Sequence, residues 1–364
     1  MTAALISGSL NAAALNDDFN YTNERFADLQ MLRYKVTGFE QLTLEQKKLV
    51  YYLSEAALCG RDILFDQNGA YNLRIRKMLE TVYTSWQGDR SSADFQALEV
   101  YLKRVWFSNG IHHHYGCEKF EPGFSQDFFR SALKSVDAKQ LPLQKGQSVD
   151  QLCDEVFPVM FDPNIMKMRV NQKDGEDLIK TSASNYYGSG VTQAEAEAFY
   201  EAQKDTTDPE PVMYGLNSRL VKKNGRLTEL RWISGGLYGK AITQIVFWLK
   251  KAATVTDTPQ QKAAINELIK FYKTGDLRTF DSYSILWLKD TEGLVDFTNG
   301  FIESYGDPLG LKASWEGLAN YKDMEATKRT EKLSANAQWF EDNSPVDPRF
   351  KKDECKGISA KVIT

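Results

Sequence analysis

Long apolar runs, an excess of one charge and paired cysteines are all missing from this sequence. No window approaches the roughly 20 apolar residues of a membrane-spanning helix, which excludes an integral membrane protein and argues against a membrane partner. Basic and acidic side chains number 45 and 49, a net charge of -4, so no global positive field is available to hold nucleic acid. The four cysteines lie far apart without a Cys-x-x-Cys pair, which predicts mostly buried thiols and no disulfide framework.

The familiar catalytic motifs are missing as well. The sequence has no His-Glu-x-x-His, no Gly-x-x-x-x-Gly-Lys-Ser/Thr, no Gly-x-Ser-x-Gly and no Gly-x-Gly-x-x-Gly. Its three histidines are consecutive, at 112–114, and cannot project from one helical face. A zinc site usually takes its ligands at i and i+4 or from separate elements. We therefore expect the histidines in a loop, hydrogen-bonded to backbone or lining a cleft.

The composition is that of an ordinary globular protein. The 364 residues are 42% hydrophobic and 26% charged, enough for one large or two medium domains. The first 19 residues lack a positively charged region, so they predict a frayed terminus or the remnant of a trimmed leader. The expected compartment is the cytoplasm, or the periplasm if a leader was removed.

Helical patterns dominate the predicted elements. Thr43 and Gln46 form a capping box that opens a helix expected to reach Phe65. Apolar periodicity and caps predict further helices at about 71–86, 93–107, 192–203, 238–255, 259–273, 276–289 and 325–340, and two short ones within 126–159. Asn224-Gly225 predicts a β-hairpin over about 219–233, and residues 356–364 alternate like a strand. The fold class is therefore α+β, largely helical with a small amount of sheet.

The densest chemical pattern is LVDFTNGFIESYGDPLGLKASWEG, at 294–317. Three acids (Asp296, Glu303, Asp307) and three aromatics (Phe297, Phe301, Tyr305) are interleaved with glycines. Such glycines and the Asp-Pro turn predict a strand ending in a tight loop, with the acids on a rigid edge. An acid beside aromatics suits a bound cation such as a peptide α-amino group. Acid and base work by Asp296 and Glu303 is the alternative.

Five segments, taken in order, resemble the dipeptidyl peptidase III family of zinc exopeptidases. GFIESYGDPLG, with VDFTN before it and WEG after it, resembles a segment of that family's lower lobe. The other four are VWFSNGIHHHYGCEKFEPGF, LNSRLVK, GLYGKAITQIVFWLKKA and LWLKDTEG. The order of the five segments along the chain makes the resemblance specific.

The resemblance implies a two-lobed metallopeptidase that removes dipeptides from the N termini of short peptides. Its lower lobe mixes helices with a small β-barrel or sheet, and its helical upper lobe holds zinc. The zinc ligands come from a His-Glu-x-x-Gly-His helix and a Glu-Glu-x-x-Arg motif, and a Glu of the first is the general base. Neither motif occurs here. The chain therefore resembles the N-terminal portion, with no catalytic residue and no metal ligand. Zinc is expected in the intact parent, and the chain alone is predicted to be inactive.

Six residues match the family's substrate cleft or its surroundings. Asp296 matches the acid that binds the free amino terminus, and Thr298 stands where some members have Tyr. Tyr115 matches an aromatic of the dipeptide subsite. The remaining candidates, which would support the cleft, are Asn299, Glu303 and Tyr305.

Three parts and two classes of function follow from these expectations. Residues 1–165 form a mainly helical part, 166–314 a mixed part with the hairpin and the anchoring segment, and 315–364 the start of a connection toward the missing catalytic lobe. In one class the chain is the substrate-anchoring portion of a zinc dipeptidyl peptidase, with the C-terminal catalytic part and short peptides as partners. In the other it is a non-catalytic peptide-binding or interaction protein that shares only this lobe.

Overall fold

The computed structural model describes residues 19–357 and residue 363, and the chain divides into two compact units, Met1–Thr37 and Gly38–Thr364. In the first unit, strands β1 (Thr22–Phe26) and β2 (Leu29–Leu32) pair as an antiparallel hairpin. The proposed leader remnant lies mostly, and the expected terminal strand partly, outside the described residues.

The second unit begins with the expected series of helices. These are α1 (Leu44–Cys59), α2 (Arg61–Gln67), α3 (Asn72–Ser85), α4 (Ala93–Ser108), α5 (Gln126–Ser135) and α6 (Val149–Phe161). The capping box is confirmed, because Thr43 Oγ1 accepts from Gln46 N and Gln46 Oε1 accepts from Thr43 N. The single helix expected to reach Phe65 is wrong, since it breaks at Gly60 into α1 and α2.

A tryptophan from far along the chain explains why the residue at the break is glycine. A Cβ built on Gly60 would lie 2.1 Å from the ring of Trp315, so that ring occupies the space where any larger residue would project. The helices after the break close around one apolar core. Its buried aromatic members are Phe65, Tyr101, Phe120, Phe124, Phe129 and Phe157.

The predicted β-hairpin is confirmed. Strands β3 (Ser218–Lys223) and β4 (Arg226–Arg231) pair around Asn224-Gly225, whose φ angles of 49° and 76° suit the tight turn that this dipeptide favours. Two helices precede it, α7 (Leu178–Thr181) and α8 (Gln193–Glu201).

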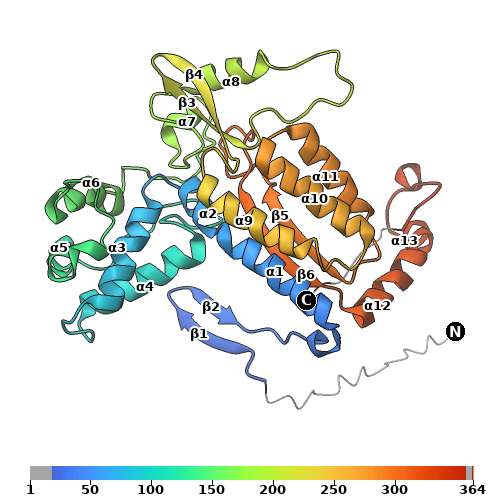
Figure 1. Ribbon diagram of the computed structural model, residues 1–364, viewed down its shortest axis with the longest axis horizontal. Coiled ribbons are helices and arrows are strands. Elements are labelled where there is room, and N and C mark those ends of the chain that lie inside the picture. Colours follow the sequence, from blue (N-terminus) through green and yellow to red (C-terminus); the bar gives the residue numbers. More distant parts are fainter. Residues whose placement is uncertain (1–18, 358–362, 364) are drawn as a thin grey trace. The chain divides into compact units, whose positions relative to one another are not determined.

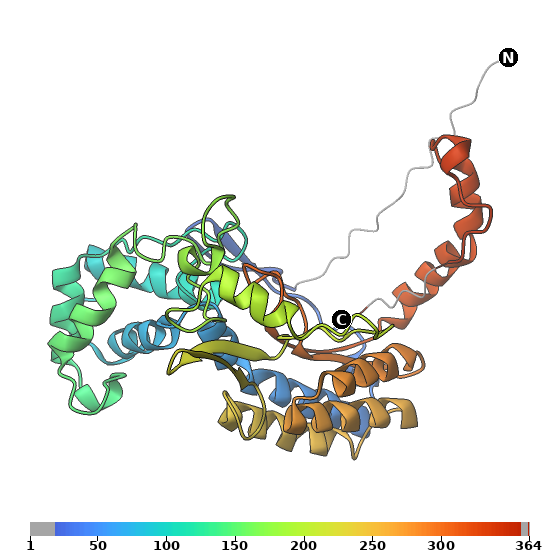
Figure 2. The same ribbon diagram turned by 90° about the horizontal axis from the view of Figure 1, so that it is seen from above.

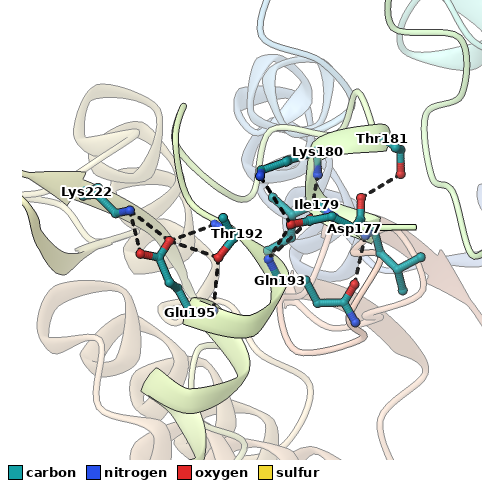
Figure 3. A network of polar contacts seen from close by, with 9 residues as sticks. Asp177, Ile179, Lys180, Thr181, Thr192, Gln193, Glu195 and Lys222 are labelled. Atoms are coloured by element: carbon teal, nitrogen blue, oxygen red, sulfur yellow. Dashed lines mark hydrogen bonds and ion pairs between the residues drawn. The ribbon is translucent and has the colours of Figure 1, made fainter. Parts of the chain in front are cut away.

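Polar contacts fix α8 to its neighbours (Figure 3). Glu195 accepts from Thr192 N at the start of α8 and from Lys222 Nζ on β3, at 2.7 and 2.9 Å from its two carboxylate oxygens. Asp177 accepts from Gln193 N and from Ile179 N, which joins the start of α7 to α8. Through Tyr200, α8 also contacts the segment 302–314, because the Tyr200 hydroxyl accepts a hydrogen bond from Lys312 Nζ.

Three helices form a series that begins beside α1. They are α9 (Gly239–Ala252), α10 (Pro259–Thr274) and α11 (Leu277–Lys289), all as predicted within a few residues. Figures 1 and 2 show α9 beside α1, α10 beside α9 and α11 beside α10. Their buried faces, with Trp232 and Tyr186, form a second apolar core.

The final elements are a two-stranded ribbon and two helices. Strand β5 (Val295–Phe301) pairs antiparallel with β6 (Trp315–Tyr321), and α12 (Met324–Ala335) and α13 (Ala337–Asn343) follow. The helix expected at 325–340 is therefore interrupted at Asn336. The described strands form three separate two-stranded sheets, none of them closed. The family resemblance implied either a small barrel or a small sheet. The described residues contain small sheets and no barrel. No helix among the described residues is long and apolar enough to cross a membrane.

Candidate functional site on the β5–β6 ribbon

Strand alternation separates the residues of β5 into two faces. Val295, Phe297 and Phe301 are at most 2% exposed and face the core, whereas Asp296 and Thr298 are half-buried on the opposite face. The register pairs Asp296 with Asn320, Thr298 with Leu318 and Gly300 with Glu316. These six positions therefore share the outer face of the ribbon.

The Asp296 carboxylate is held by α11 and by its own strand. Trp287 Nε1 donates to Asp296 Oδ1 at 3.0 Å and to the Phe297 carbonyl at 2.9 Å. Phe297 N donates to the same carboxylate oxygen at 2.8 Å. These contacts fix the direction of an acid that stays half-buried, which is the condition for oriented binding of a cation.

Two neighbouring hollows lie along the outer face. One of about 370 Å³ surrounds Asp296 and is walled on the α11 side by Trp287, Leu288 and Thr291. The other, of about 700 Å³, is walled by α1, α2 and the end of α4, and its polar lining includes Ser54, Arg61, Asn109 and Glu316. Thr298 and Leu318 line both hollows. We call the two together the ribbon groove.

Glu316 lines the larger hollow together with Arg61, and two residues of the loop after β5 lie close enough to act on it. Burial, followed by the charge of Glu303, raises the pKa of Glu316, whose Oε1 is buried without a hydrogen-bond partner among the described residues. Glu303 and Tyr305 are exposed, and burial together with a hydrogen bond to Glu303 raises the pKa of Tyr305. Glu303, Glu316 and Tyr305 thus influence one another at the start of the loop that connects the two strands.

Asn299 and Asp307 lie in the interior. Asn299 is 2% exposed and its Oδ1 accepts from the Tyr272 hydroxyl at 2.6 Å, on the core face of β5. Asp307 is 1% exposed and accepts from Leu311 N, Lys312 N and the Tyr187 hydroxyl. The expectation that all three acids of 294–317 sit on a rigid strand edge is therefore wrong for Asp307, which lies buried in the loop after β5.

Tyr115 lies on the histidine loop and is 85% exposed. No hydrogen bond, ion pair or ring contact joins it to Asp296 within the described residues. The loop is tied to the ribbon groove indirectly, because Arg169 Nη1 donates to Asn68 Oδ1 at 3.2 Å and Asn68 Nδ2 donates to the carbonyl of Asn109, a lining residue.

The histidine loop does not fit a zinc site. His112 Nε2 lies 2.7 Å from the Met166 carbonyl, and burial lowers the pKa of His112 to about 4. His113 Nδ1 accepts from Tyr115 N and Gly116 N, as expected for imidazoles bonded to backbone. Among residues 19–357 and 363, no group of three His, Cys, Asp or Glu side chains is placed to hold a metal ion.

Several lining residues were not predicted from the sequence. Trp287, Leu318, Asn320, Arg61 and Glu316 line the ribbon groove, yet they are spread over three segments. The β6 residues could have been found by pairing β5 with an alternating run after the Asp-Pro turn, since register assigns partners on one face. No local pattern identifies Arg61, which depends on how α1 and α2 pack.

Similarity to known proteins agrees with the resemblance drawn from the sequence. The model of peptidase family M49 matches residues 221–357. Dipeptidyl peptidase 3 from Homo sapiens is 21% identical over 348 residues, covering 87% of this chain and 47% of the human protein. Dipeptidyl peptidase 3 from Dictyostelium discoideum is 23% identical, with the same coverage. The structure of DPP III from Caldithrix abyssi matches with a TM-score of 0.57 at 17% identity, over 86% of this chain and 47% of that one.

In sequence over residues 221–357 and in fold, the chain is similar to the M49 peptidases. Within them, the chain is related to the dipeptidyl peptidase III family, and the part it matches is the N-terminal portion. The chain spans about half the length of the curated relatives it matches.

Proposed function

We propose that this chain is the substrate-anchoring portion of a zinc dipeptidyl peptidase that removes dipeptides from the N termini of short peptides. In this proposal the chain corresponds to the lower lobe, and residues 315–364 lead toward a C-terminal part that supplies zinc and catalysis. The cytoplasm, or the periplasm after removal of a leader, is the proposed compartment. The observation that carries the proposal is the oriented Asp296 carboxylate at one end of the ribbon groove, in a chain related to this family.

The chemistry of the ribbon groove supports this role. A peptide ammonium group can donate charge-assisted hydrogen bonds to the Asp296 carboxylate. Trp287 and the strand backbone already hold that carboxylate in one direction. Thr298 and Leu318 border both hollows. The first residues of a bound peptide can therefore extend their side chains from the smaller hollow into the larger one. Tyr115, Glu303 and Tyr305 are proposed as outer supports, and Asn299 as a residue that stiffens β5 through Tyr272.

Binding of a tetrapeptide with a free amino terminus tests the anchor. Asp296→Asn keeps an oxygen for Trp287 Nε1 but removes the charge, so we expect roughly 10-fold or greater loss of affinity in calorimetry, from the 1.5–3 kcal/mol typical of a hydrogen bond to a charged group. The wild-type chain should bind the N-acetylated peptide about as weakly as Asp296→Asn binds the peptide with a free amino terminus. The matched control is Glu292→Gln, an exposed acid on the preceding loop, which should leave the affinity unchanged. Equal binding of both peptides would contradict the anchoring role.

Joining the chain to the C-terminal half of a matched relative separates the two classes of function. If the chain is the anchoring portion of an enzyme, zinc-dependent release of dipeptides should appear in the joined protein and fall with Asp296→Asn, while zinc content stays constant. A peptide-binding protein that shares only this lobe would still bind free amino termini, but joining would yield no hydrolysis.

A further inference from the structure

Cys117 lies in a strained turn directly after the histidines. Its φ of 63° is in the left-handed region, and its side chain is half-buried. Cys117 N donates to the His113 carbonyl at 3.1 Å, and its own carbonyl accepts from Arg169 N at 2.8 Å. The backbone therefore holds the thiol at a fixed place beside Arg169.

Arg169 is a buried cation without an acidic partner. It is 8% exposed, and no carboxylate among the described residues lies within ion-pair distance. Its Nη2 contacts the His114 carbonyl at 3.2 Å and Cys117 Sγ at 3.6 Å, Nη1 bonds Asn68, and Nε is buried without a hydrogen-bond partner. Of these contacts, the Cys117 thiol alone can become an anion. The guanidinium therefore lies where it can hold an anionic oxygen that is added to this sulfur.

The neighbouring acid along the chain, Glu118, does not displace this contact. The Glu118 carboxylate folds over Gly116, where an added Cβ would meet Glu118 Oε2 at 2.0 Å. The other thiols lie in less favourable surroundings. Burial raises the pKa of Cys153 to about 11, and burial with the charge of Glu55 raises the pKa of Cys59. Cys117 is thus distinguished by geometry, since its sulfur touches a buried positive group and remains partly open to solvent.

We propose that Cys117 is an oxidant-sensitive thiol that a hydroperoxide converts to a sulfenate, which Arg169 holds. The thiol first gives its proton to solvent. The sulfur then attacks one peroxide oxygen, so an S–O bond forms and the O–O bond breaks. The sulfur loses two electrons, and the departing oxygen takes a proton to leave as water or an alcohol. The site stands independently of the proposed peptide binding.

The added oxygen would change the contacts of the neighbouring residue. Cys117 Sγ also donates to the Tyr115 carbonyl at 3.6 Å, a contact that a deprotonated sulfenate cannot make. Oxidation therefore removes a donor from the carbonyl of an exposed aromatic residue. A thiol reductant restores both the thiol and this contact.

Trapping with dimedone tests the proposal on the intact chain. After exposure to stoichiometric hydrogen peroxide, peptide mass spectrometry should find the dimedone adduct forming at Cys117 at least about 10-fold faster than at Cys355, which is also half-buried. Arg169→Gln should remove most of this advantage, and Arg169→Lys, which keeps the charge, should retain part of it. Adduct formation at Cys355 should be the same in all three chains.

A measurement without variants covers the case in which Arg169→Gln fails to fold. In urea the contact between Arg169 and the sulfur is lost, so iodoacetamide should alkylate Cys117 and Cys355 of the wild-type chain at similar rates, whereas the native chain should favour Cys117. If Cys117 reacts no faster than Cys355 in the native chain, or keeps its advantage in urea, the proposal is wrong.

Discussion

Lys312 fixes the loop between β5 and β6 by an unusual degree of burial. The side chain is fully buried, and its Nζ donates to the Tyr200 hydroxyl at 2.5 Å and to Gly215 O and Ser218 Oγ at 3.3 Å. Burial lowers the pKa of Lys312 to about 8, although Asp307 and Glu229 oppose that shift. One side chain thus ties the loop to α8 and to β3.

The pH dependence of stability should reveal Lys312. Because its folded pKa is about 8 and its unfolded pKa is 10.5, the unfolded chain binds more protons between these values. The free energy of unfolding of the wild type, relative to Lys312→Met, should therefore rise with pH across this window, by up to roughly 3 kcal/mol for a shift of this size. Urea unfolding of both chains at pH 7 and pH 9.5 measures the difference.

The matched control is Lys204→Met, in the exposed segment just after α8. Lys204 is 59% exposed and pairs with Glu201, so its difference from wild type should be flat over the same pH range. A flat profile for Lys312→Met as well would show that folding does not lower the pKa of the buried lysine.

Asp296 and Asp307 show that residue type alone does not predict where an acid lies in the fold. Asp296 and Asp307 stand 11 positions apart in one segment and are chemically identical in sequence, yet one is half-buried at the groove and the other anchors a loop in the interior. Period-2 alternation correctly predicts the face of Asp296 once β5 is assumed. The burial of Asp307 depends on Tyr187 and Lys312, and the Tyr187 contact arises from a segment about 120 residues away.

At the scale of elements, the glycine at the break between α1 and α2 is required by a distant residue. The helix pattern continues through Gly60, and only the ring of Trp315, more than 250 residues later, gives that glycine its role. Elements defined by local chemistry, such as the Asn224-Gly225 hairpin and the Thr43 capping box, were predicted correctly. Glycines required by distant side chains have no local pattern to predict them.

Replacing Gly60 should therefore disturb both the helix break and the ribbon groove. A Cβ at 2.1 Å from the Trp315 ring forces the indole to move, so Gly60→Ala should lose about 1–3 kcal/mol of stability, as is typical of overpacking. Chemical unfolding measures the loss, and weaker peptide binding should accompany it, because Trp315 lines the larger hollow.

Gly235→Ala serves as the control, since a Cβ there meets no atom within 4 Å. It should change stability by less than about 0.5 kcal/mol, as most surface substitutions do. Equal stability of the two variants would mean that the indole yields its position without cost.

At the scale of the whole molecule, buried tyrosines are spread through both apolar cores. Burial raises the phenol pKa of seven tyrosines above the ordinary value of a tyrosine. These are Tyr101, Tyr186, Tyr187, Tyr200, Tyr238, Tyr272 and Tyr283. Tyr101 belongs to the core of α3 to α6 and the others to, or beside, the core around α9 and α10. The high aromatic content of the sequence predicted that aromatic side chains pack in the core. Only the structure identifies which tyrosines are buried and therefore have a raised pKa.

Stability should fall steeply once the pH passes the ordinary tyrosine value of about 10. The unfolded chain then loses phenolic protons that the folded chain retains, so the contribution of these groups is complete below that pH and is lost above it. Absorbance of phenolate at 295 nm should rise together with the loss of far-ultraviolet circular dichroism. Ionisation of these phenols with the helices intact would contradict their burial.

The helical α+β class, the hairpin and the acid at the groove follow from sequence, whereas the walls of the groove follow from packing. Those walls contain two indoles in different situations. Trp287 donates a hydrogen bond to Asp296, and Trp315 is nearly enclosed against Gly60. The chain therefore carries its own pair of optical reporters, one in each hollow. A cation drawn to Asp296 perturbs the emission of Trp287 through its electric field, while a side chain filling the larger hollow changes the polarity around Trp315 and with it the wavelength at which that indole emits.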